Sequence, residues 1–162
     1  HDTPEAVSEL AEQRPLSVYG ATKAAQLGFL RTAAIELAPR GTTVRAWDLG
    51  DIPLFNADVE AQGDPAAVEA FKQEIAGADA LLIATPEYNS SVPGQLKNAL
   101  DFLYAEWNDK VAGIVCYGSN GGFRAAEQLK LSLNELQVAV VRAQVELSTE
   151  VDERTRLLGE TA

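Results

Sequence analysis

Continuous apolar runs alternate with amphipathic stretches along most of this chain. Three apolar runs are typical of strands that are buried on both faces of a sheet: residues 79–85, 110–117 and 138–147. Three stretches carry apolar side chains at helical spacing: residues 64–78, 94–107 and 122–136. Strands that alternate with helices in this way predict an α/β fold built on a parallel sheet with helices on both faces.

The pattern before residue 50 is weaker but continues the alternation. Residues 16–19 are a weak strand candidate, and residues 42–49 are rich in β-branched side chains. Between them a helical stripe stops at Pro39-Arg40-Gly41, and it consists of Ala25, Leu27, Leu30, Ala33, Ala34 and Leu37. We therefore expect a doubly wound, five-stranded parallel sheet in three layers. The expected organisation is an N-terminal arm or short helix at 1–14, one domain at 15–147 and a short tail at 148–162.

Composition narrows the function classes. The chain has 162 residues, enough for one domain, and its 24 acidic against 13 basic residues give a formal charge of −11. The basic residues are scattered, so we expect no nucleic-acid partner. No run approaches the length of a membrane span, and the only cysteine, Cys116, lies in an apolar run. The sequence therefore predicts a cytoplasmic protein that binds no membrane and whose cysteine is a core residue.

The segment from Pro86 to Asp101 is the most informative part of the chain, and it reads PEYNSSVPGQLKNALD. It joins an apolar run to a helix, and loops at the carboxyl edge of a parallel sheet are where α/β proteins bind ligands. The segment resembles the PEYNxSxPGxLKNxLD signature of the NADPH-dependent FMN reductases, and the resemblance extends over about residues 47–147. It implies a flavodoxin-like fold, FMN as cofactor, NADPH or NADH as cosubstrate, and a small-molecule electron acceptor such as a quinone or azo compound.

Two loops are candidate flavin contacts. The first offers backbone N–H groups, an aromatic ring and an amide, which suit a planar ring edged with acceptors. The resemblance implies that it lines the isoalloxazine edge with Pro86, Glu87, Tyr88 and Asn89. The second loop is glycine-rich and opens a helix, and glycines allow a ligand to approach the backbone closely and permit a positive φ. It resembles the other flavin-contacting loop of the family through Tyr117, Gly118, Ser119, Gly121 and Gly122. The alternative interpretation is that both segments are ordinary turns.

The loop that would hold the FMN phosphate departs from the family pattern. The family has a GSxRxxSxNxxL-like segment here, and in this chain only Gly20 matches, with Thr22 and Lys23 as possible substitutes. The helix N-terminus still offers backbone amides. We therefore expect affinity for FMN to be lowered even if the ring pocket is intact.

Residues 15–46 resemble a different family, the short-chain dehydrogenases, with Tyr19 and Lys23 in a YxxxK arrangement. A short-chain dehydrogenase also needs a glycine-rich dinucleotide fingerprint and a catalytic serine, and the residues before Pro15 provide neither. We interpret the pair as a relic and the chain as chimera-like. Two alternatives to a flavin reductase follow: a recombined or engineered flavodoxin-like scaffold with impaired or no flavin binding, and a short-chain dehydrogenase.

The remaining chemistry is sparse. The resemblance assigns no protein acid or base to catalysis, because the cofactor carries the electrons. The acidic clusters have no histidine or cysteine at ligand spacing, so no metal site is expected. Residues 94–107 carry more apolar surface than one sheet face needs, which favours a homodimer: Leu96, Leu100, Phe102, Leu103, Tyr104 and Trp107.

Overall fold

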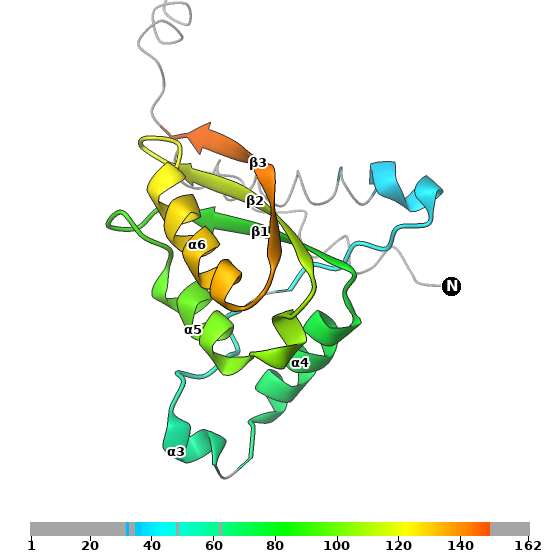
Figure 1. Cartoon of the computed structure of the whole chain (residues 1–162), viewed down its shortest axis with the longest axis vertical. Coiled ribbons are helices and arrows are strands. Elements are labelled where there is room, and N and C mark those ends of the chain that lie inside the picture. Colours follow the sequence, from blue (N-terminus) through cyan, green and yellow to red (C-terminus); the bar gives the residue numbers. More distant parts are fainter. Residues whose placement is uncertain (1–31, 33–34, 48, 62, 150–162) are drawn as a thin grey trace, which may run out of the picture. The chain divides into compact units, whose positions relative to one another are not determined.

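The structure is a computed structural model, shown in Figure 1, and it describes residues 32, 35–47, 49–61 and 63–149. The chain divides into two compact units, residues 1–47 and 48–162, and each is described here by itself. The predicted arm at 1–14, the strand candidate at 16–19 and the tail from residue 150 lie outside the described residues. The predicted domain bounds stay a prediction.

The described part of the first unit contains the end of the predicted helix. Thr32 and residues 35–37 are helical, and a 3-10 turn, η1 (Ala38–Arg40), follows. Gly41 ends it with a left-handed φ of 78°, and its N–H donates to the carbonyl oxygen of Ala38. The predicted stop at residues 39–41 is confirmed. The predicted strand at 42–49 is wrong for residues 42–47, since β-branched side chains make a strand only where a neighbouring strand supplies hydrogen bonds.

The second unit is built on a parallel sheet with the strand order β1-β2-β3. The strands are β1 (Ala80–Pro86), β2 (Val111–Gly118) and β3 (Ala139–Ser148). β1 and β2 pair in one unbroken register from Ala80 opposite Val111 to Pro86 opposite Tyr117. The register of β2 with β3 shifts once, between Ala112 and Ile114, where β3 contains extra residues. These strands confirm the three apolar runs that were predicted as strands.

The helices of this unit are α3 (Ala57–Glu60), α4 (Ala66–Gly77), α5 (Gly94–Phe102), the 3-10 turn η2 (Ala105–Trp107) and α6 (Phe123–Glu135). α4 and α6 confirm the helical stretches predicted there, while α3 was not predicted. The C-terminus of α4 is capped by Lys110, whose ammonium donates to the carbonyl oxygens of Ala76 at 3.2 Å and Ala78 at 2.8 Å. None of the described helices is both long enough and apolar enough to cross a membrane.

α5 is shorter than the predicted helix at 94–107. Leu103 leaves it with an extended backbone, and η2 then turns the chain so that Leu103 and Trp107 are both buried. The Trp107 ring meets Phe71 of α4 edge-on, with 5.9 Å between ring centroids. Of the six apolar residues predicted to form a dimer surface, only Tyr104 is exposed, so this apolar surface belongs to the core. The homodimer loses that support and stays an untested prediction.

One cluster forms the core of this unit between the sheet and its helices. Ala112, Ile114 and Cys116 of β2 lie in it with the buried faces of α4, α5 and α6, and α6 crosses the sheet in Figure 1. These helices therefore cover one face of the sheet, and the predicted third layer stays a prediction.

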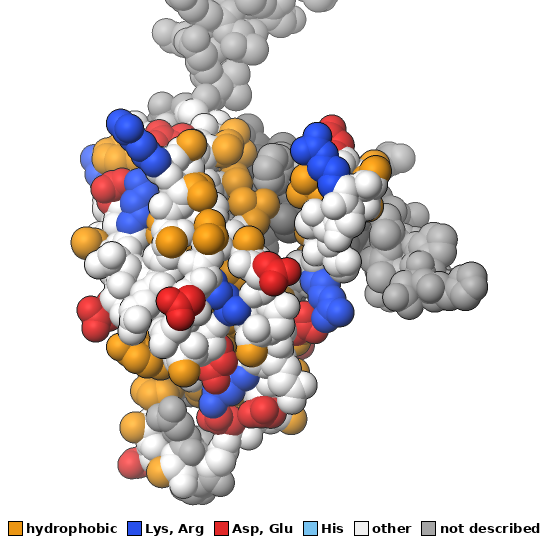
Figure 2. All heavy atoms as spheres, turned by 45° about the vertical axis from the view of Figure 1, so that its right-hand side comes forward, with side chains coloured by type: hydrophobic (Ala, Val, Ile, Leu, Met, Phe, Trp, Pro, Cys, Tyr) orange, Lys and Arg blue, Asp and Glu red, His pale blue; other side chains and the backbone are white. Residues whose placement is uncertain are grey.

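Five apolar side chains outside the cluster are 36–44% exposed: Leu82, Val111, Val141, Val145 and Leu147. On the face shown in Figure 2, Lys and Arg lie among Asp and Glu.

Candidate functional site at the carboxyl edge of the sheet

The two predicted loops meet at one edge of the sheet. β1 ends at Pro86 and β2 at Gly118, and because the strands are parallel, the loops that follow leave from the same edge (Figure 1). The N–H of Glu87 donates to the carbonyl oxygen of Tyr117 at 2.8 Å, which continues the sheet pairing one residue beyond β1. The two segments that are candidate flavin contacts therefore lie side by side at this edge.

The first loop is a tight turn from Tyr88 to Ser91. Two backbone hydrogen bonds close it, from the Tyr88 N–H to the Ser91 oxygen at 2.9 Å and from the Ser91 N–H to the Tyr88 oxygen at 3.0 Å. Asn89 and Ser90 at its tip both have left-handed backbones, with φ of 51° and 63°. Positive φ at both central residues is the pattern of a type I′ turn. The turn exposes Asn89, and the Tyr88 side chain is 45% exposed.

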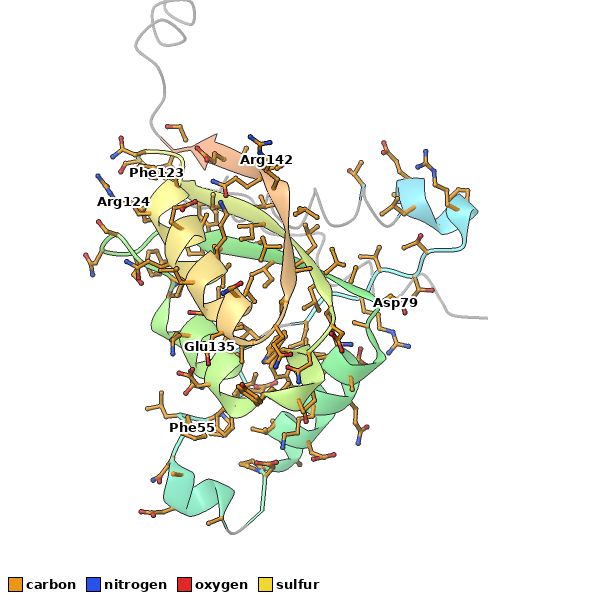
Figure 3. All side chains as sticks on the ribbon, viewed as in Figure 1. Phe55, Asp79, Phe123, Arg124, Glu135 and Arg142 are labelled. Atoms are coloured by element: carbon orange, nitrogen blue, oxygen red, sulfur yellow. The ribbon has the colours of Figure 1, made fainter. Side chains whose placement is uncertain are left out.

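The Glu87 carboxylate points back into the protein and caps α6. Its Oε2 accepts the N–H of Arg124 at 3.0 Å and is 3.4 Å from the N–H of Ala125. The Arg124 guanidinium lies 3.6 Å from Oε1, and Figure 3 shows Arg124 at the start of α6, beside this loop. The residue that precedes α6 is Gly122, which has no side chain to cap the helix. Glu87 supplies that cap from another loop.

Gln128 of α6 holds the far side of the same turn. Its amide nitrogen donates to the carbonyl oxygen of Ser90 at 3.1 Å, and its amide oxygen accepts the Ser91 hydroxyl at 2.7 Å. The turn is thus attached to α6 at both of its ends, by Glu87 and by Gln128. Sequence reasoning missed Gln128, because a lone glutamine on the polar side of a helix carries no motif.

The second loop is held closely against the first. Gly121 and Gly122 have φ of 76° and 80°, which confirms that this loop needs left-handed residues. A Cβ atom at Gly122 would lie 2.5 Å from the backbone nitrogen of Tyr117, and one at Gly118 would lie 3.1 Å from the Cβ of Glu87. These two glycines therefore make room for neighbouring protein atoms, whereas the sequence analysis attributed the glycines of this loop to close approach of a ligand.

The end of β3 also joins the second loop. The Thr149 N–H donates to the carbonyl oxygen of Gly118 at 2.9 Å, and the Ser148 hydroxyl donates to that of Ser119 at 3.1 Å. The ends of all three strands are therefore connected at this edge. The second loop is thus held through the carbonyl groups of Gly118 and Ser119. Some of its N–H groups donate no hydrogen bond within the described residues.

The unused donors match one edge of a flavin. Within the described residues the N–H groups of Asn89, Ser119 and Asn120 donate to no other group, and all three residues are exposed. A flavin ring presents carbonyl oxygens and ring nitrogens along its pyrimidine edge, and these acceptors need donors of this kind. The donor set thus fits FMN at the ring. Gly20, Thr22 and Lys23, the predicted phosphate contacts, lie outside the described residues, as does Tyr19.

Asn98 of α5 hydrogen-bonds to a third segment, residues 53–55. Asn98 was not among the residues predicted from the sequence. The Asn98 amide nitrogen donates to the Pro53 carbonyl oxygen at 2.7 Å, and its amide oxygen accepts the Phe55 N–H at 2.7 Å. The Phe55 ring then meets Phe102 edge-on, at 5.2 Å between centroids. Asn98 lies inside the family-like segment 86–101, which is the signal that could have identified it.

Cys116 lies beneath the site and is fully buried, as predicted. Its thiol approaches the carbonyl oxygen of Val145 at 3.5 Å. Burial, together with the charge of Glu146, raises the pKa of the Cys116 thiol to about 11. The thiol is therefore protonated at neutral pH and a poor nucleophile. Among the described residues no group of three His, Cys, Asp or Glu side chains could hold a metal ion.

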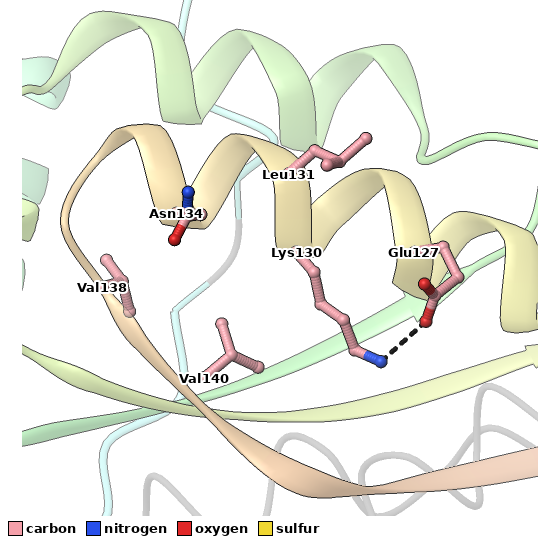
Figure 4. Close-up of a pocket in the computed structure, with 6 residues that line it drawn as sticks. All are labelled: Glu127, Lys130, Leu131, Asn134, Val138 and Val140. Carbon is pink, nitrogen blue, oxygen red and sulfur yellow. Dashed lines mark hydrogen bonds and ion pairs between the residues drawn. The ribbon is translucent and has the colours of Figure 1, made fainter.

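A separate hollow of about 420 Å³ lies beside α6 and β3 (Figure 4). It is lined by Glu127, Lys130, Leu131, Asn134, Val138 and Val140. The charged groups of Glu127 and Lys130 pair with each other at 2.7 Å. Val138 directly precedes β3 and Val140 lies near its beginning, at the opposite end from the loops. The hollow is therefore not part of the candidate flavin site.

The chain is similar in sequence to curated quinone reductases. A quinone reductase of Pseudomonas putida is 42% identical over 108 residues, covering 62% of this chain and 58% of the relative. A 2-hydroxy-1,4-benzoquinone reductase of a Burkholderia species is 46% identical over 84 residues, covering 52% and 45%. The chain thus spans about half the length of these curated relatives.

Solved structures show the same fold. FerB, an NAD(P)H:(acceptor) oxidoreductase from Paracoccus denitrificans, superposes with a TM-score of 0.64 at 28% identity, over 80% of each chain. An azoreductase from Bacillus anthracis superposes with a TM-score of 0.58 at 15% identity over 93% of this chain and 87% of the other, a likeness of fold alone. Both support the parallel α/β architecture of the second unit.

The family assignment extends further toward the N-terminus than the sequence analysis expected. The profile of the NADPH-dependent FMN reductases matches residues 18–152, against the expected 47–147. The match includes most of the segment that resembles a short-chain dehydrogenase, and no comparison supports that second resemblance or the chimera-like interpretation. The fold, the paired loops and a match over most of the chain agree: the chain belongs to the NADPH-dependent FMN reductase family.

Proposed function

We propose that the chain binds FMN at the carboxyl edge of its sheet and uses NADPH or NADH to reduce a quinone-type acceptor. The observation that carries the proposal is the set of unused N–H donors of Asn89, Ser119 and Asn120 on two loops that the protein holds together. The names of the relatives, which are quinone reductases and FMN reductases, support the same activity. A bound FMN supplies the two-electron transfer from the nicotinamide to the acceptor.

The residues of the chain bind and orient the ring. The backbone donors fix its pyrimidine edge, and the half-exposed Tyr88 offers an aromatic face beside it. Asn89 adds a side-chain amide at the tip of the turn. No side chain needs to act as acid or base. Gly20, Thr22 and Lys23 are proposed to contact the phosphate, together with the backbone of their loop.

The finer features of the fold and assembly belong to this proposal as well. Of the two further strands predicted for a five-stranded flavodoxin-like sheet, the strand at 16–19 stays a proposal, as does a second helical layer, and the family assignment supports both. A cytoplasmic location, an azo compound as another acceptor and a homodimer remain predictions. Size-exclusion chromatography with light scattering would decide the last of these.

The proposal is tested with the purified chain and added FMN. We expect the near-ultraviolet and blue absorbance bands of bound flavin, and NADPH oxidation that requires both FMN and a benzoquinone. Asn89→Gly retains the left-handed turn and removes only the side-chain amide, so it should weaken FMN binding severalfold. Glu135→Gln, at the exposed end of α6, is the matched control and should bind as the parent does.

The alternative interpretation, a flavodoxin-like scaffold that binds no flavin, predicts the opposite result. A folded, colourless protein that binds no added FMN and oxidises no NADPH would exclude the reductase. It would favour the interpretation that the altered phosphate loop has abolished cofactor binding.

A further inference from the structure

Glu87 combines a buried charge with an exposed loop. Its side chain is 10% exposed, whereas the neighbouring Tyr88 is 45% exposed. A carboxylate is seldom buried unless hydrogen bonds and opposite charge stabilise it. Here both are present, since its oxygens face two N–H groups at the start of α6 and the guanidinium of Arg124.

The geometry is that of a helix cap supplied from a distance. The N–H groups of Arg124 and Ala125 are the second and third of α6, which are the ones that a capping side chain normally satisfies. A carboxylate at a helix N-terminus also interacts favourably with the helix dipole. Gly122 cannot be replaced by a residue with its own capping side chain, because a Cβ there would collide with the Tyr117 backbone. The first N–H groups of α6 therefore depend on the Glu87 carboxylate for their cap.

The same residue also fixes the two loops to each other. Its backbone N–H donates to the carbonyl oxygen of Tyr117, and its Cβ lies 3.1 Å from the position that a Cβ atom at Gly118 would take. The turn that carries Asn89 begins at Tyr88, the residue after Glu87. These contacts link the loop of Asn89 to the loop of Ser119, and the Glu87 carboxylate adds a further link to Arg124 at the start of α6, where the second loop ends.

We propose that Glu87 is a positioning residue for flavin binding, whose carboxylate caps α6 and so holds the two donor-bearing loops in place. This inference rests on the proposed function. It also changes the role that the sequence resemblance gives to this side chain, since the carboxylate faces α6 and the flavin would meet only its backbone. The N-terminus of α6 is then occupied by the protein's own anion.

The experiment compares Glu87→Ala, Glu87→Gln and the control Glu127→Gln, which removes an exposed carboxylate from the same helix. Thermal unfolding without flavin and the Kd for FMN, from fluorescence quenching, are measured for each. We expect Glu87→Ala to lower the unfolding midpoint by about 5 °C and to weaken FMN binding at least tenfold. Glu87→Gln retains one acceptor oxygen and should lie between Glu87→Ala and the parent. Glu127→Gln should match the parent.

Chemical rescue separates positioning from simple loss of stability. Glu87→Ala leaves two N–H groups and Arg124 facing a space of carboxylate size, so acetate should restore FMN affinity and the midpoint, while chloride at equal ionic strength should not. Unchanged FMN affinity in Glu87→Ala, or a loss in Glu87→Ala that acetate fails to reverse, would overturn the proposal. If the parent binds no flavin, the proposed function fails, and the unfolding midpoint with and without acetate still tests the cap.

Discussion

At the scale of single residues, Ser90 at the tip of the turn has a left-handed backbone. It has a φ of 63° without being glycine, and a left-handed backbone costs a residue with a Cβ atom about 1 kcal/mol. We expect Ser90→Gly to raise the free energy of unfolding by about 0.5 to 1 kcal/mol in urea titrations. Ser132→Gly inside α6 is the matched control and should lower it by a similar amount. A loss of stability in both variants would contradict the strain.

Cys116 gives a pH-dependent prediction. Burial raises the pKa of its thiol to about 11, against an ordinary value of 9.0 in the unfolded chain. The folded chain therefore keeps the proton where the unfolded chain releases it, so the contribution of Cys116 to stability is present below pH 9.0 and is lost as the pH rises toward 11.

The measurement compares urea unfolding of the parent and Cys116→Ala at about pH 7 and about pH 10. Substitution of the buried thiol costs stability at both values. The stability advantage of the parent over the variant should shrink by about 1 kcal/mol between them, because other groups titrate equally in both proteins. An advantage that is constant with pH would show that the pKa is not raised.

At the scale of elements, Asn98 determines how residues 53–55 lie against α5. Its two hydrogen bonds of 2.7 Å satisfy one backbone donor and one backbone acceptor. Asn98→Ala should therefore lower the free energy of unfolding by about 2 kcal/mol. Gln95→Ala, at an exposed position of the same helix, should change it by less than about 0.5 kcal/mol. Equal effects of the two substitutions would mean that the Asn98 bonds contribute nothing.

The elements also show what the sequence can and cannot predict. Local signals sufficed for β1, α4, β2, α6 and β3, because apolar runs, Pro65 and the glycines before α6 act over neighbouring residues. The end of α5 was wrong, since burial of Leu103 and Trp107 by tertiary packing overrides a helical pattern that continues past Phe102. Glu87 and Gln128 act on partners 37 and 38 residues away, and such contacts leave no periodic trace in the sequence.

At the scale of the whole molecule, the proposed flavin binding divides into a ring site and a phosphate site. The ring loops have family-like sequences, whereas only Gly20 of the phosphate loop matches the family pattern. If phosphate contacts are missing, FMN and riboflavin should bind with similar affinity, because each lost charge-assisted hydrogen bond is worth about 1.5 to 3 kcal/mol. Titrations by fluorescence quenching of both flavins would measure this.

A lysine variant tests what remains of the phosphate site. Lys23→Ala should weaken FMN and leave riboflavin unchanged, and Lys97→Ala, which removes an ion pair with Asp101 on the surface of α5, should affect neither. Much tighter binding of FMN than of riboflavin, with no effect of Lys23→Ala, would mean that the backbone of residues 20–28 holds the phosphate by itself.

The register shift in β3 has a consequence for how this chain tolerates changes in length. Between the pairs Ala112–Val140 and Ile114–Gln144, β3 has three residues where β2 has only Gly113. Side chains alternate between the faces of a strand, so two extra residues keep the later ones in phase. Deleting two residues from 141–143 would leave Leu147 on its own face, whereas deleting one would turn every later side chain over. Tolerance to deletion here should therefore depend on parity, with even losses accepted and odd losses rejected.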